Sequence, residues 1–473
     1  MGEAEARGAA RRRAARRSWA IPLACLAAVA IFWPCLRYGF AMDDFALLEA
    51  GRAPLGVGVP AHFVPRAGVH YRPLAQYGYF FAADRLFGEH PLPFHLANLL
   101  LHLLNVALAG ALLARFARDR LAAGLATLFF AAHSALFLVI AWAALAGEAI
   151  PLLFVLLALW CYMNHLGRRG GRWLAATLLA VAAALLSKQV AVALPPALIL
   201  YQLLCRPAGR RFRGWRVPLD ASAAALLAPL AAYGWFVLRV SGPHASGPYH
   251  LVFAPDAIRT ALTYALWTAD LPRLFDTPAA AGLALAAAGA AALATYAALR
   301  RDRVLLFGLG WFALFLAPVA FLPEHLFHYY LYAPLFGAAL VLARLAEPAL
   351  AALRPARTRA VVAGALALAL LATDAAGVAT ELGTNPTMAQ AAQGRRALAV
   401  LHADHPTLPR GATIEFVAPA DHVYYVLGYG AAVRLAYPHT PVTVVFDGIT
   451  APPAGRGPVY RYRWTGATIE AVR

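Results

Sequence analysis

Long uncharged stretches alternate with short arginine-rich connections along most of this 473-residue chain. The hydrocarbon core of a bilayer is about 30 Å thick, and roughly 20 consecutive apolar residues in a helix are enough to cross it. A mean hydropathy of +0.62, with 62% hydrophobic and 14% charged residues, agrees with this pattern. Such a composition excludes an ordinary water-soluble domain, so the sequence predicts a protein that crosses a membrane several times.

Eleven stretches qualify as candidate transmembrane helices. They lie near residues 18–38, 94–114, 121–139, 149–165, 173–187, 189–205, 220–239, 277–299, 304–322, 331–350 and 360–380. The first follows the basic run at 11–17 and is long enough to span the bilayer, which favours a retained signal anchor over a cleaved signal peptide. We therefore expect a basic cytoplasmic tail at 1–17 and an all-α membrane domain at 18–380.

Arginines are distributed unevenly between alternate loops. If the tail at 1–17 is cytoplasmic, the loops on its side include 115–120 and 166–172, each with three arginines, whereas 140–148 and 323–330 on the other side contain neither Lys nor Arg. This asymmetry follows the positive-inside rule and explains the net charge of +18 without a nucleic-acid partner. We expect a cytoplasmic N-terminus and a location in the plasma membrane of a bacterial cell.

Two predicted outer loops, at 39–93 and 240–276, are long enough to contain helices of their own. After residue 380 the pattern changes to short β-branched segments, such as 412–417 and 442–446, separated by Gly, Pro and Asp turns. This pattern is typical of a small α/β domain. We expect that domain at 381–473, on the outer side of the membrane.

Ionisable side chains inside or beside membrane spans are costly and usually face a cavity, so they are the first candidates for a functional site. In this sequence they gather on the predicted outer side. The strongest candidates are Asp43, Asp44, Arg72 and Lys188. Further candidates for lining the site are His70, Tyr71, His95, Glu148, Gln189, Glu324, His325 and His328.

Two adjacent aspartates, Asp43 and Asp44, follow the first span. Asp favours helix N-caps, and its charge suits a helix N-terminus, so one of the pair has a plausible structural role before residues 45–49. A cap needs one carboxylate, which leaves the other for catalysis or for a divalent cation. Neighbouring carboxylates resist simultaneous ionisation, so one of them can act as a general base on a hydroxyl group.

Arg72 and Lys188 are cations that suit a phosphate group, Arg as a bidentate fork and Lys as a point charge. The alternative for both is an interfacial side chain that extends toward lipid headgroups. Lys188 is the more informative, because it is the sole lysine of the chain and lies on the side that the positive-inside rule disfavours.

The second span places His95, Asn98, His102 and Asn105 on one face of a helix. For His102 and Asn105 we expect hydrogen bonds between helices, worth ~0.6–2 kcal/mol each. The spacing lacks the carboxylate of a His-Glu-x-x-His zinc motif, so a metalloprotease is disfavoured.

The order of these motifs resembles the GT-C superfamily of polytopic glycosyltransferases. The resemblance rests on Asp-Asp at 43–44, Tyr-Arg-Pro-Leu at 71–74, Phe-His-Leu-Ala-Asn-Leu-Leu-Leu-His at 94–102 and Leu-Leu-Ser-Lys-Gln at 185–189. It is closest to the protein O-mannosyltransferase type and to related transmembrane enzymes with TPR repeats, which this chain lacks. Gln189 stands where such relatives often have Glu.

The resemblance implies a hexosyltransferase that moves a sugar from a polyprenyl-phosphate donor to an acceptor hydroxyl on a protein or glycan at the outer face. Asp43 or Asp44 would be the catalytic base, and Arg72 and Lys188 would lie near the donor phosphate. No cofactor is implied beyond a divalent cation between the two aspartates. The main alternative is a transporter or flippase of lipid-linked glycans, although the sequence shows no duplicated halves. A lipid-linked glycan ligase or polymerase would differ in its acceptor.

Overall fold

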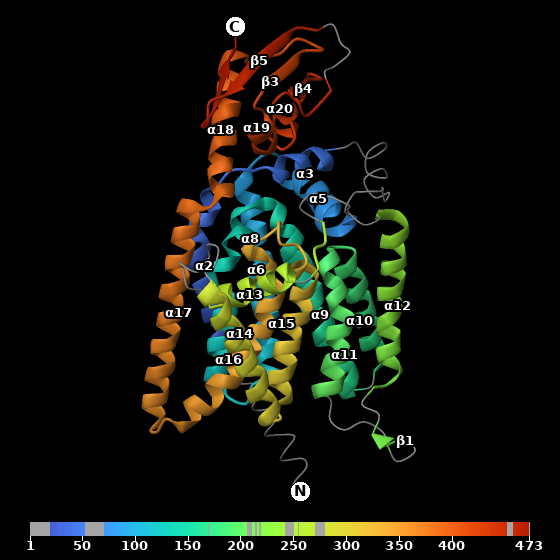
Figure 1. Cartoon of the computed structure of the whole chain (residues 1–473), viewed down its shortest axis with the longest axis vertical. Coiled ribbons are helices and arrows are strands. Elements are labelled where there is room, and N and C mark those ends of the chain that lie inside the picture. The colour runs from blue at the N-terminus through green and yellow to red at the C-terminus, as the bar shows by residue number, and fades with distance from the viewer. Residues whose placement is uncertain are drawn as a thin grey trace.

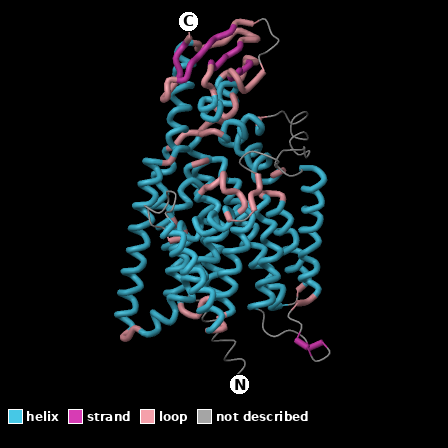
Figure 2. The backbone as a smooth tube through the Cα atoms, in the orientation of Figure 1, coloured by secondary structure: helices cyan, strands magenta, loops and turns pink. Residues whose placement is uncertain are grey.

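The computed structural model describes residues 19–52, 71–168, 170–205, 211–212, 215–216, 219–241, 250–253, 255–269, 280–451 and 457–472. Long helices lie side by side in a bundle, and a small domain with a β-sheet covers one end of it (Figures 1 and 2). This architecture confirms the predicted class, a helical membrane protein with a small C-terminal α/β domain. We call the covered end of the bundle the domain end and the opposite end the far end.

The bundle consists of helices that follow the predicted apolar stretches. They are α2 (Ala20–Phe32), α6 (Pro91–Phe116), α7 (Arg120–Ala132), α8 (Phe137–Ala141), α9 (Ala146–Arg168), α10 (Gly171–Leu185), α11 (Leu194–Cys205), α12 (Ala221–Phe236), α14 (Ala280–Leu299), α15 (Arg303–Ala320), α16 (Tyr332–Ala352) and α17 (Ala356–Thr384). Within the described residues, eight segments are long and apolar enough to cross a membrane. Each coincides with one of the eleven predicted stretches.

The other three predicted stretches are helical but are not simple spans. The stretch at 121–139 is bent by 41° between α7 and η3 (Ser134–Leu136), which leads into α8. Helices α10 and α11 are short, and the chain between them includes Lys188 in an extended conformation and η5 (Gln189–Ala193). Lys188 forms a buried ion pair with Glu148, so the helix break turns this cation toward an acid instead of lipid.

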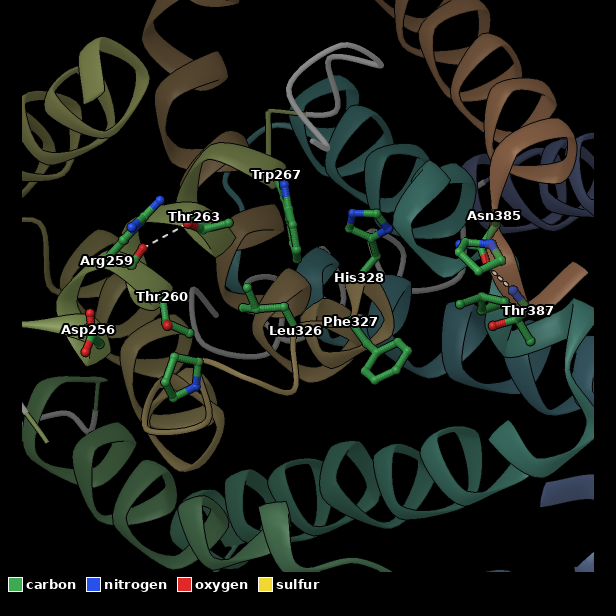
Figure 3. A pocket seen from close by; sticks show the side chains of 13 residues that line it. Asp256, Arg259, Thr260, Thr263, Trp267, Leu326, Phe327, His328, Asn385 and Thr387 are labelled. Atoms are coloured by element: carbon green, nitrogen blue, oxygen red, sulfur yellow. Dashed lines mark hydrogen bonds between the residues drawn. The ribbon is translucent and has the colours of Figure 1, made fainter. Parts of the chain in front are cut away.

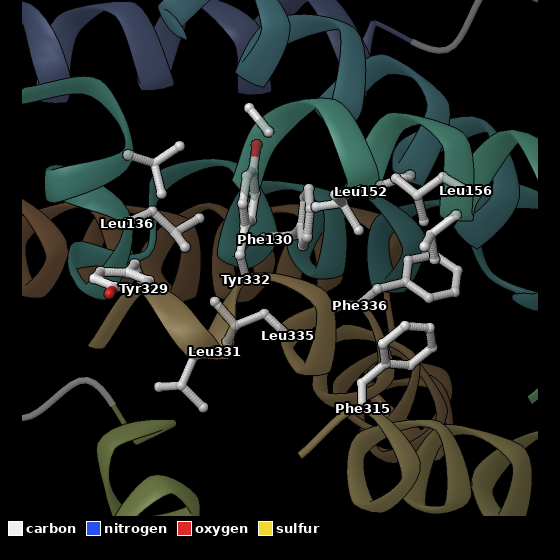
Figure 4. Close-up of a cluster of buried hydrophobic side chains, with 14 of the residues drawn as sticks. Phe130, Leu136, Leu152, Leu156, Phe315, Tyr329, Leu331, Tyr332, Leu335 and Phe336 are labelled. Atoms are coloured by element: carbon white, nitrogen blue, oxygen red, sulfur yellow. The ribbon is translucent and has the colours of Figure 1, made fainter. Parts of the chain in front are cut away.

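Apolar packing between α6, α7, α9, α15 and α16 forms the main core, and Figure 4 shows part of it around Tyr332 and Phe336. Helices α15 and α16 approach closely at Gly308 and Gly337. A Cβ on Gly337 would lie 2.5 Å from the Gly308 carbonyl oxygen, and one on Gly308 would lie 2.9 Å from the Gly337 oxygen. Small residues therefore set this interface, as is common between membrane helices.

Polar side chains of α6 join it to neighbouring helices. His102 Nδ1 lies 2.6 Å from the Tyr332 hydroxyl, and Asn105 donates to the Ala149 carbonyl at 2.9 Å. Both side chains are fully buried. The predicted role of His102 and Asn105 in hydrogen bonds between helices is confirmed.

The two predicted long loops contain short helices. The first contributes α3 (Asp43–Gly51), η2 (Pro73–Gly78) and α5 (Tyr79–Phe87), and Figure 1 shows α3 and α5 beneath the C-terminal domain. The second contributes α13 (Asp256–Trp267), which lies farther from that domain, next to α14.

The C-terminal domain begins with α18 (Pro386–Asp404), which rises from the end of α17 (Figure 1). Its sheet has the strand order β4-β3-β5-β6, formed by Thr443–Phe446, Thr413–Val417, Val459–Trp464 and Ile469–Ala471. Strand β3 pairs in parallel with β4 and β5, and β6 is antiparallel to β5. Helices α19 (Asp421–Val426) and α20 (Ala431–Ala436) lie between this sheet and the bundle (Figure 1). A separate two-residue hairpin, β1 (Arg211–Phe212) and β2 (Trp215–Arg216), lies at the far end.

The C-terminal domain shares a hydrophobic core with the first long loop. Buried Phe45 and Leu48 of α3 pack in one cluster with Val423 and Leu427 of the domain. Arg434 of α20 adds an ion pair with Glu49 of α3. The domain is therefore docked on α3, the helix that starts with the two aspartates.

Candidate active site

The carboxylate of Asp44 accepts hydrogen bonds from two backbone N–H groups. Its Oδ2 accepts from Ala41 N at 2.9 Å and its Oδ1 accepts from Ala144 N at 2.6 Å, so it joins the start of α3 to η4 (Ala143–Leu145). The residue is fully buried. Burial raises the pKa of Asp44 to about 8 against the effect of these N–H donors, and the neighbouring charge of Asp43 raises it further.

Asp43 has a different environment. It is half-buried in the first turn of α3, and its Oδ1 accepts a hydrogen bond from the Tyr429 hydroxyl at 2.9 Å. Burial raises the pKa of Asp43, while the Tyr429 hydrogen bond and the positive charge of Arg72 oppose this effect. Neither aspartate is the N-cap itself, since Met42 occupies that position, so both act on the helix through its first turn.

Two cations lie close to these acids. Arg72 is half-buried, donates from Nε to Gln189 Oε1 at 2.8 Å, and is within electrostatic reach of Asp43, Lys188 and His325. The backbone supports this arrangement, because Leu74 N donates to the carbonyl of Leu186 next to the break after α10. Arg72 and Lys188 come from different parts of the chain and converge at the domain end.

Lys188 is buried between an acid and two aromatic rings. Its ammonium pairs with Glu148 at the start of α9, and its Nζ lies 5.5 Å and 5.0 Å from the ring centres of Tyr329 and Tyr330. Cation–π contacts of this kind hold an ammonium group in a site from which water is excluded. The site therefore contains a buried Lys188–Glu148 pair within electrostatic reach of Arg72.

Three histidines predicted for the site have distinct surroundings. Burial, together with the charges of Lys188 and Arg72, lowers the pKa of His325 to about 4, so its imidazole is neutral at neutral pH. His328 Nδ1 lies 3.6 Å from a carboxylate oxygen of Glu381. His95 is fully buried and its two ring nitrogens face the carbonyls of Ile140 and Tyr38.

The remaining predicted residues complete this account. Tyr71 packs its ring against Phe236 at 5.2 Å, and Glu324 is exposed. His70 lies outside the described residues. The structure thus brings Asp43, Arg72, Lys188, Gln189, Glu148 and His325 together, and places His95 and Glu324 apart from this group.

The sequence analysis missed Tyr429, Tyr329 and Tyr330 as site residues. Tyr329 and Tyr330 give no local indication in the sequence of a charged partner, although aromatic rings are common partners of a buried lysine. Tyr429 stands in a Gly-Tyr-Gly turn, which predicts an unusual backbone but gives no indication of a partner 386 residues away.

A cavity of about 590 Å³ opens at the domain end, between α13, the loop before η8 (His328–Leu331) and the start of α18. Figure 3 shows Trp267 next to His328 in this pocket, with Arg259 on one side and Asn385 on the other. The loop of residues 323–330 separates the cavity from Lys188, because Tyr329 and Tyr330 of the same loop contact the lysine. The pocket therefore adjoins the cation site.

Within the described ranges, no three His, Cys, Asp or Glu side chains are grouped so as to hold a metal ion. Both oxygens of Asp44 already accept backbone hydrogen bonds. A divalent cation at Asp43 and Asp44 stays a prediction of the sequence analysis.

Comparison with known proteins identifies the fold. The chain has the GT-C glycosyltransferase fold, which confirms the resemblance that the sequence motifs predicted. The sequence model of the dolichyl-phosphate-mannose-protein mannosyltransferase family matches residues 79–235, from α5 to α12. No curated protein sequence matches the chain.

Two solved structures are similar in fold to the whole chain. Both are crystal structures of ArnT from Cupriavidus metallidurans, one bound to undecaprenyl phosphate and one in the apo state. The first covers 92% of this chain and 87% of ArnT with a TM-score of 0.50, and the second covers 90% and 86% with a TM-score of 0.51. Sequence identity is 16% in both cases.

Proposed function

We propose that this protein transfers a sugar from a polyprenyl-phosphate donor to an acceptor hydroxyl at the outer face of the membrane, with Asp43 as the general base. The ArnT structure with undecaprenyl phosphate supports a lipid phosphate as the donor carrier. The family match at residues 79–235 supports a hexose such as mannose as the sugar and a protein as the acceptor.

The observation that carries the proposal is the difference in burial and hydrogen bonding between Asp43 and Asp44. Asp44 is fully buried with both oxygens bound to backbone N–H groups, so it cannot reach an acceptor hydroxyl. Asp43 is half-buried, and its contact with Tyr429 uses only Oδ1. A partly buried carboxylate with a raised pKa beside a cation is a typical general base.

In the proposed reaction, Asp43 takes the proton of the acceptor hydroxyl while the hydroxyl oxygen attacks the anomeric carbon. The bond between that carbon and the donor phosphate oxygen breaks, and the polyprenyl phosphate leaves as an anion. Arg72 and Lys188 stabilise this anion, which is the kind of electrostatic contribution that supplies much of the rate in such reactions. A single displacement of this kind inverts the configuration at the anomeric carbon.

The test is donor turnover by the purified protein in lipid. Polyprenyl-phosphate mannose and other polyprenyl-phosphate sugars are offered to the wild type and to Asp43→Asn, Asp44→Asn and Lys188→Ala, and free polyprenyl phosphate is measured. We expect Asp43→Asn to lower turnover by about 10²-fold or more. We expect Asp44→Asn to lower mainly the yield of folded protein, since it weakens a link between α3 and η4.

Glu324→Gln is the matched control, because Glu324 is an exposed carboxylate on the loop next to the site. It should leave turnover unchanged. Turnover with and without a chelator tests the divalent cation, and the anomeric configuration of the product tests the single displacement. Intact donors in every sample would overturn the proposal, and flipping of the same lipids would then be measured to test the transporter alternative.

A further inference from the structure

One hydrogen bond joins the candidate base to the C-terminal domain. The Tyr429 hydroxyl donates to Asp43 Oδ1 at 2.9 Å across 386 residues of sequence. We propose that Tyr429 is a positioning residue for Asp43, so that the active site is complete only when the C-terminal domain is docked. This inference rests on the proposed function of Asp43.

Backbone strain lies on both sides of this contact. Three non-glycine residues of the described chain have positive φ angles, and two of them are Met42 at 46° and Tyr429 at 60°. Met42 precedes Asp43 directly. Residues held in such conformations persist when the surrounding structure over-determines them, and they cluster at functional sites.

The turn that contains Tyr429 packs closely against the start of α3. Gly428 and Gly430 on either side of it have φ angles of 55° and 87°. A Cβ on Gly428 would lie 2.4 Å from the Met42 carbonyl oxygen and 2.9 Å from Phe45 Cβ, so no larger residue fits. This close approach fixes the distance between the tyrosine and the carboxylate.

Docking of the domain does not depend on this hydroxyl. The shared apolar cluster of α3 and the domain is extensive, and Arg434 pairs with Glu49 on the same surface. Tyr429 itself is 39% exposed. The hydrogen bond therefore contributes little to the buried surface between the domain and α3. Its effect is to orient the Asp43 carboxylate toward the acceptor hydroxyl of the proposed reaction.

The geometry leaves Asp43 Oδ2 to receive the proton. Tyr429 holds Oδ1, Arg72 faces the carboxylate from the start of η2, and Asp44 is the neighbouring acid on α3. Burial and the charge of Asp43 raise the pKa of Tyr429, so its hydroxyl remains a donor throughout the working range of pH. A hydrogen bond to the ionised form lowers the pKa of the acceptor, so Tyr429 keeps Asp43 ionised at lower pH than Asp43 alone would allow.

The experiment compares Tyr429→Phe with the wild type in the donor-turnover assay over a range of pH. We expect kcat to fall roughly 10- to 100-fold, the range for loss of a hydrogen bond to a charged group, with the KM for the donor nearly unchanged. We also expect the acid limb of the kcat profile to move to higher pH, since the carboxylate loses a donor that favours its charged form.

Two control variants separate positioning from docking. Tyr425→Phe removes a hydroxyl from the adjacent exposed ring, 6.0 Å from Tyr429, and should behave as the wild type. Arg434→Gln removes the ion pair with Glu49 and a 3.5 Å hydrogen bond to the Tyr429 carbonyl, but it keeps the Tyr429 hydroxyl, and should leave the acid limb in place. Thermal unfolding of each variant shows whether the protein remains folded.

The inference is overturned if Tyr429→Phe matches Tyr425→Phe in both kcat and acid limb while Asp43→Asn is inactive, and the proposed function then stands. It is also overturned if Tyr429→Phe loses activity with an unmoved acid limb and an unfolding temperature several degrees below that of the wild type, since the loss would then come from unfolding or undocking. Absence of turnover in the wild type overturns both proposals.

Discussion

Acids at the two ends of the bundle differ in how completely their charge is compensated. At the far end, Arg344 binds Asp302 through Nε at 3.0 Å and Nη2 at 2.6 Å, and it also pairs with Glu347. Asp302 in turn caps α15 through Val304 N and Leu305 N at 3.1 Å. Every charge in this group has a partner of opposite sign or a row of donors.

A second far-end acid follows the same rule. Asp119 caps α7 by accepting from Leu121 N at 2.8 Å and Ala122 N at 3.0 Å, and it pairs with Arg359 of α17. One carboxylate thus stabilises a helix end and joins two helices. These far-end residues are structural.

At the domain end Lys188 and Arg434 also have acidic partners, in Glu148 and Glu49, but the charge of Asp43 is less compensated. Burial disfavours the ionised form of Asp302, but Arg344 and the backbone donors outweigh it and hold the pKa of Asp302 below its ordinary value. Burial also disfavours ionised Asp43, and there the opposing contacts do not outweigh it, so the pKa of Asp43 is raised. Complementary charges give stability, whereas incompletely balanced ones give reactivity.

The largest effect on activity is expected from Arg72→Gln. Loss of a cation that stabilises the leaving phosphate should lower kcat by about 10³-fold, or ~4 kcal/mol of transition-state stabilisation. Thermal unfolding should change little, because Arg72 is half-buried and has one neutral partner in Gln189. Arg72→Lys should recover only part of the rate, since Lys lacks the bidentate fork. If kcat of Arg72→Gln stayed within threefold of the wild type, the conclusion that charges at the domain end serve activity would be wrong.

Arg344→Gln should have the reverse profile. It leaves Asp302 and Glu347 without their shared cation in a largely buried place, at a cost of ~3 kcal/mol in the free energy of unfolding. The unfolding temperature should fall by several degrees, while kcat per folded molecule stays unchanged. A loss of kcat with unchanged unfolding would show that the far end has a functional role.

Asp44 should make the free energy of unfolding depend on pH. Its pKa is about 8 in the folded protein, against an ordinary value of 3.8, so the folded state binds a proton that the unfolded state releases. The contribution is fully present below pH 3.8 and is lost as the pH rises to about 8, by at most about 1.4 kcal/mol per pH unit. Asp44→Asn should flatten this part of the profile in thermal unfolding from pH 5 to 8. An unchanged slope in Asp44→Asn would assign the dependence to other groups.

The smallest effect is expected from Glu49→Gln at the docking surface. Glu49 and Arg434 are each 37% exposed, so their ion pair is screened by solvent and should contribute ~0.5 kcal/mol. The unfolding temperature should stay within about 2 °C of that of the wild type. A shift as large as that of Arg344→Gln would show that the domain is held mainly by charge and not by its apolar core.

The hydropathy of the chain predicted where helices form but not how each of them runs. Eight of the stretches are long helices. Their positions could be predicted because the length of an apolar stretch, which decides whether it can cross a bilayer, is visible in the local sequence. The bend at His133 and the break at Lys188 depend on partners elsewhere in the chain. For Lys188 the partner is Glu148, forty residues earlier, which no window of hydropathy can detect.

The sequence predicted most residues of the candidate site, but it did not distinguish their individual roles. Asp43, Arg72 and Lys188 were found because ionisable residues beside apolar spans are rare and costly. The sequence could not distinguish Asp43 from Asp44, because the difference lies in Ala144 N and the Tyr429 hydroxyl, which are 100 and 386 residues away.

The sequence by itself determined the membrane class, the long loops at one face, the set of ionisable residues and the small C-terminal domain, since each follows from local composition and periodicity. Only the tertiary structure decided which aspartate is held by backbone donors and which one meets the Tyr429 hydroxyl. The physical reason is that a carboxylate acquires its role from the donors, charges and burial around it, and most of these groups come from distant parts of the chain.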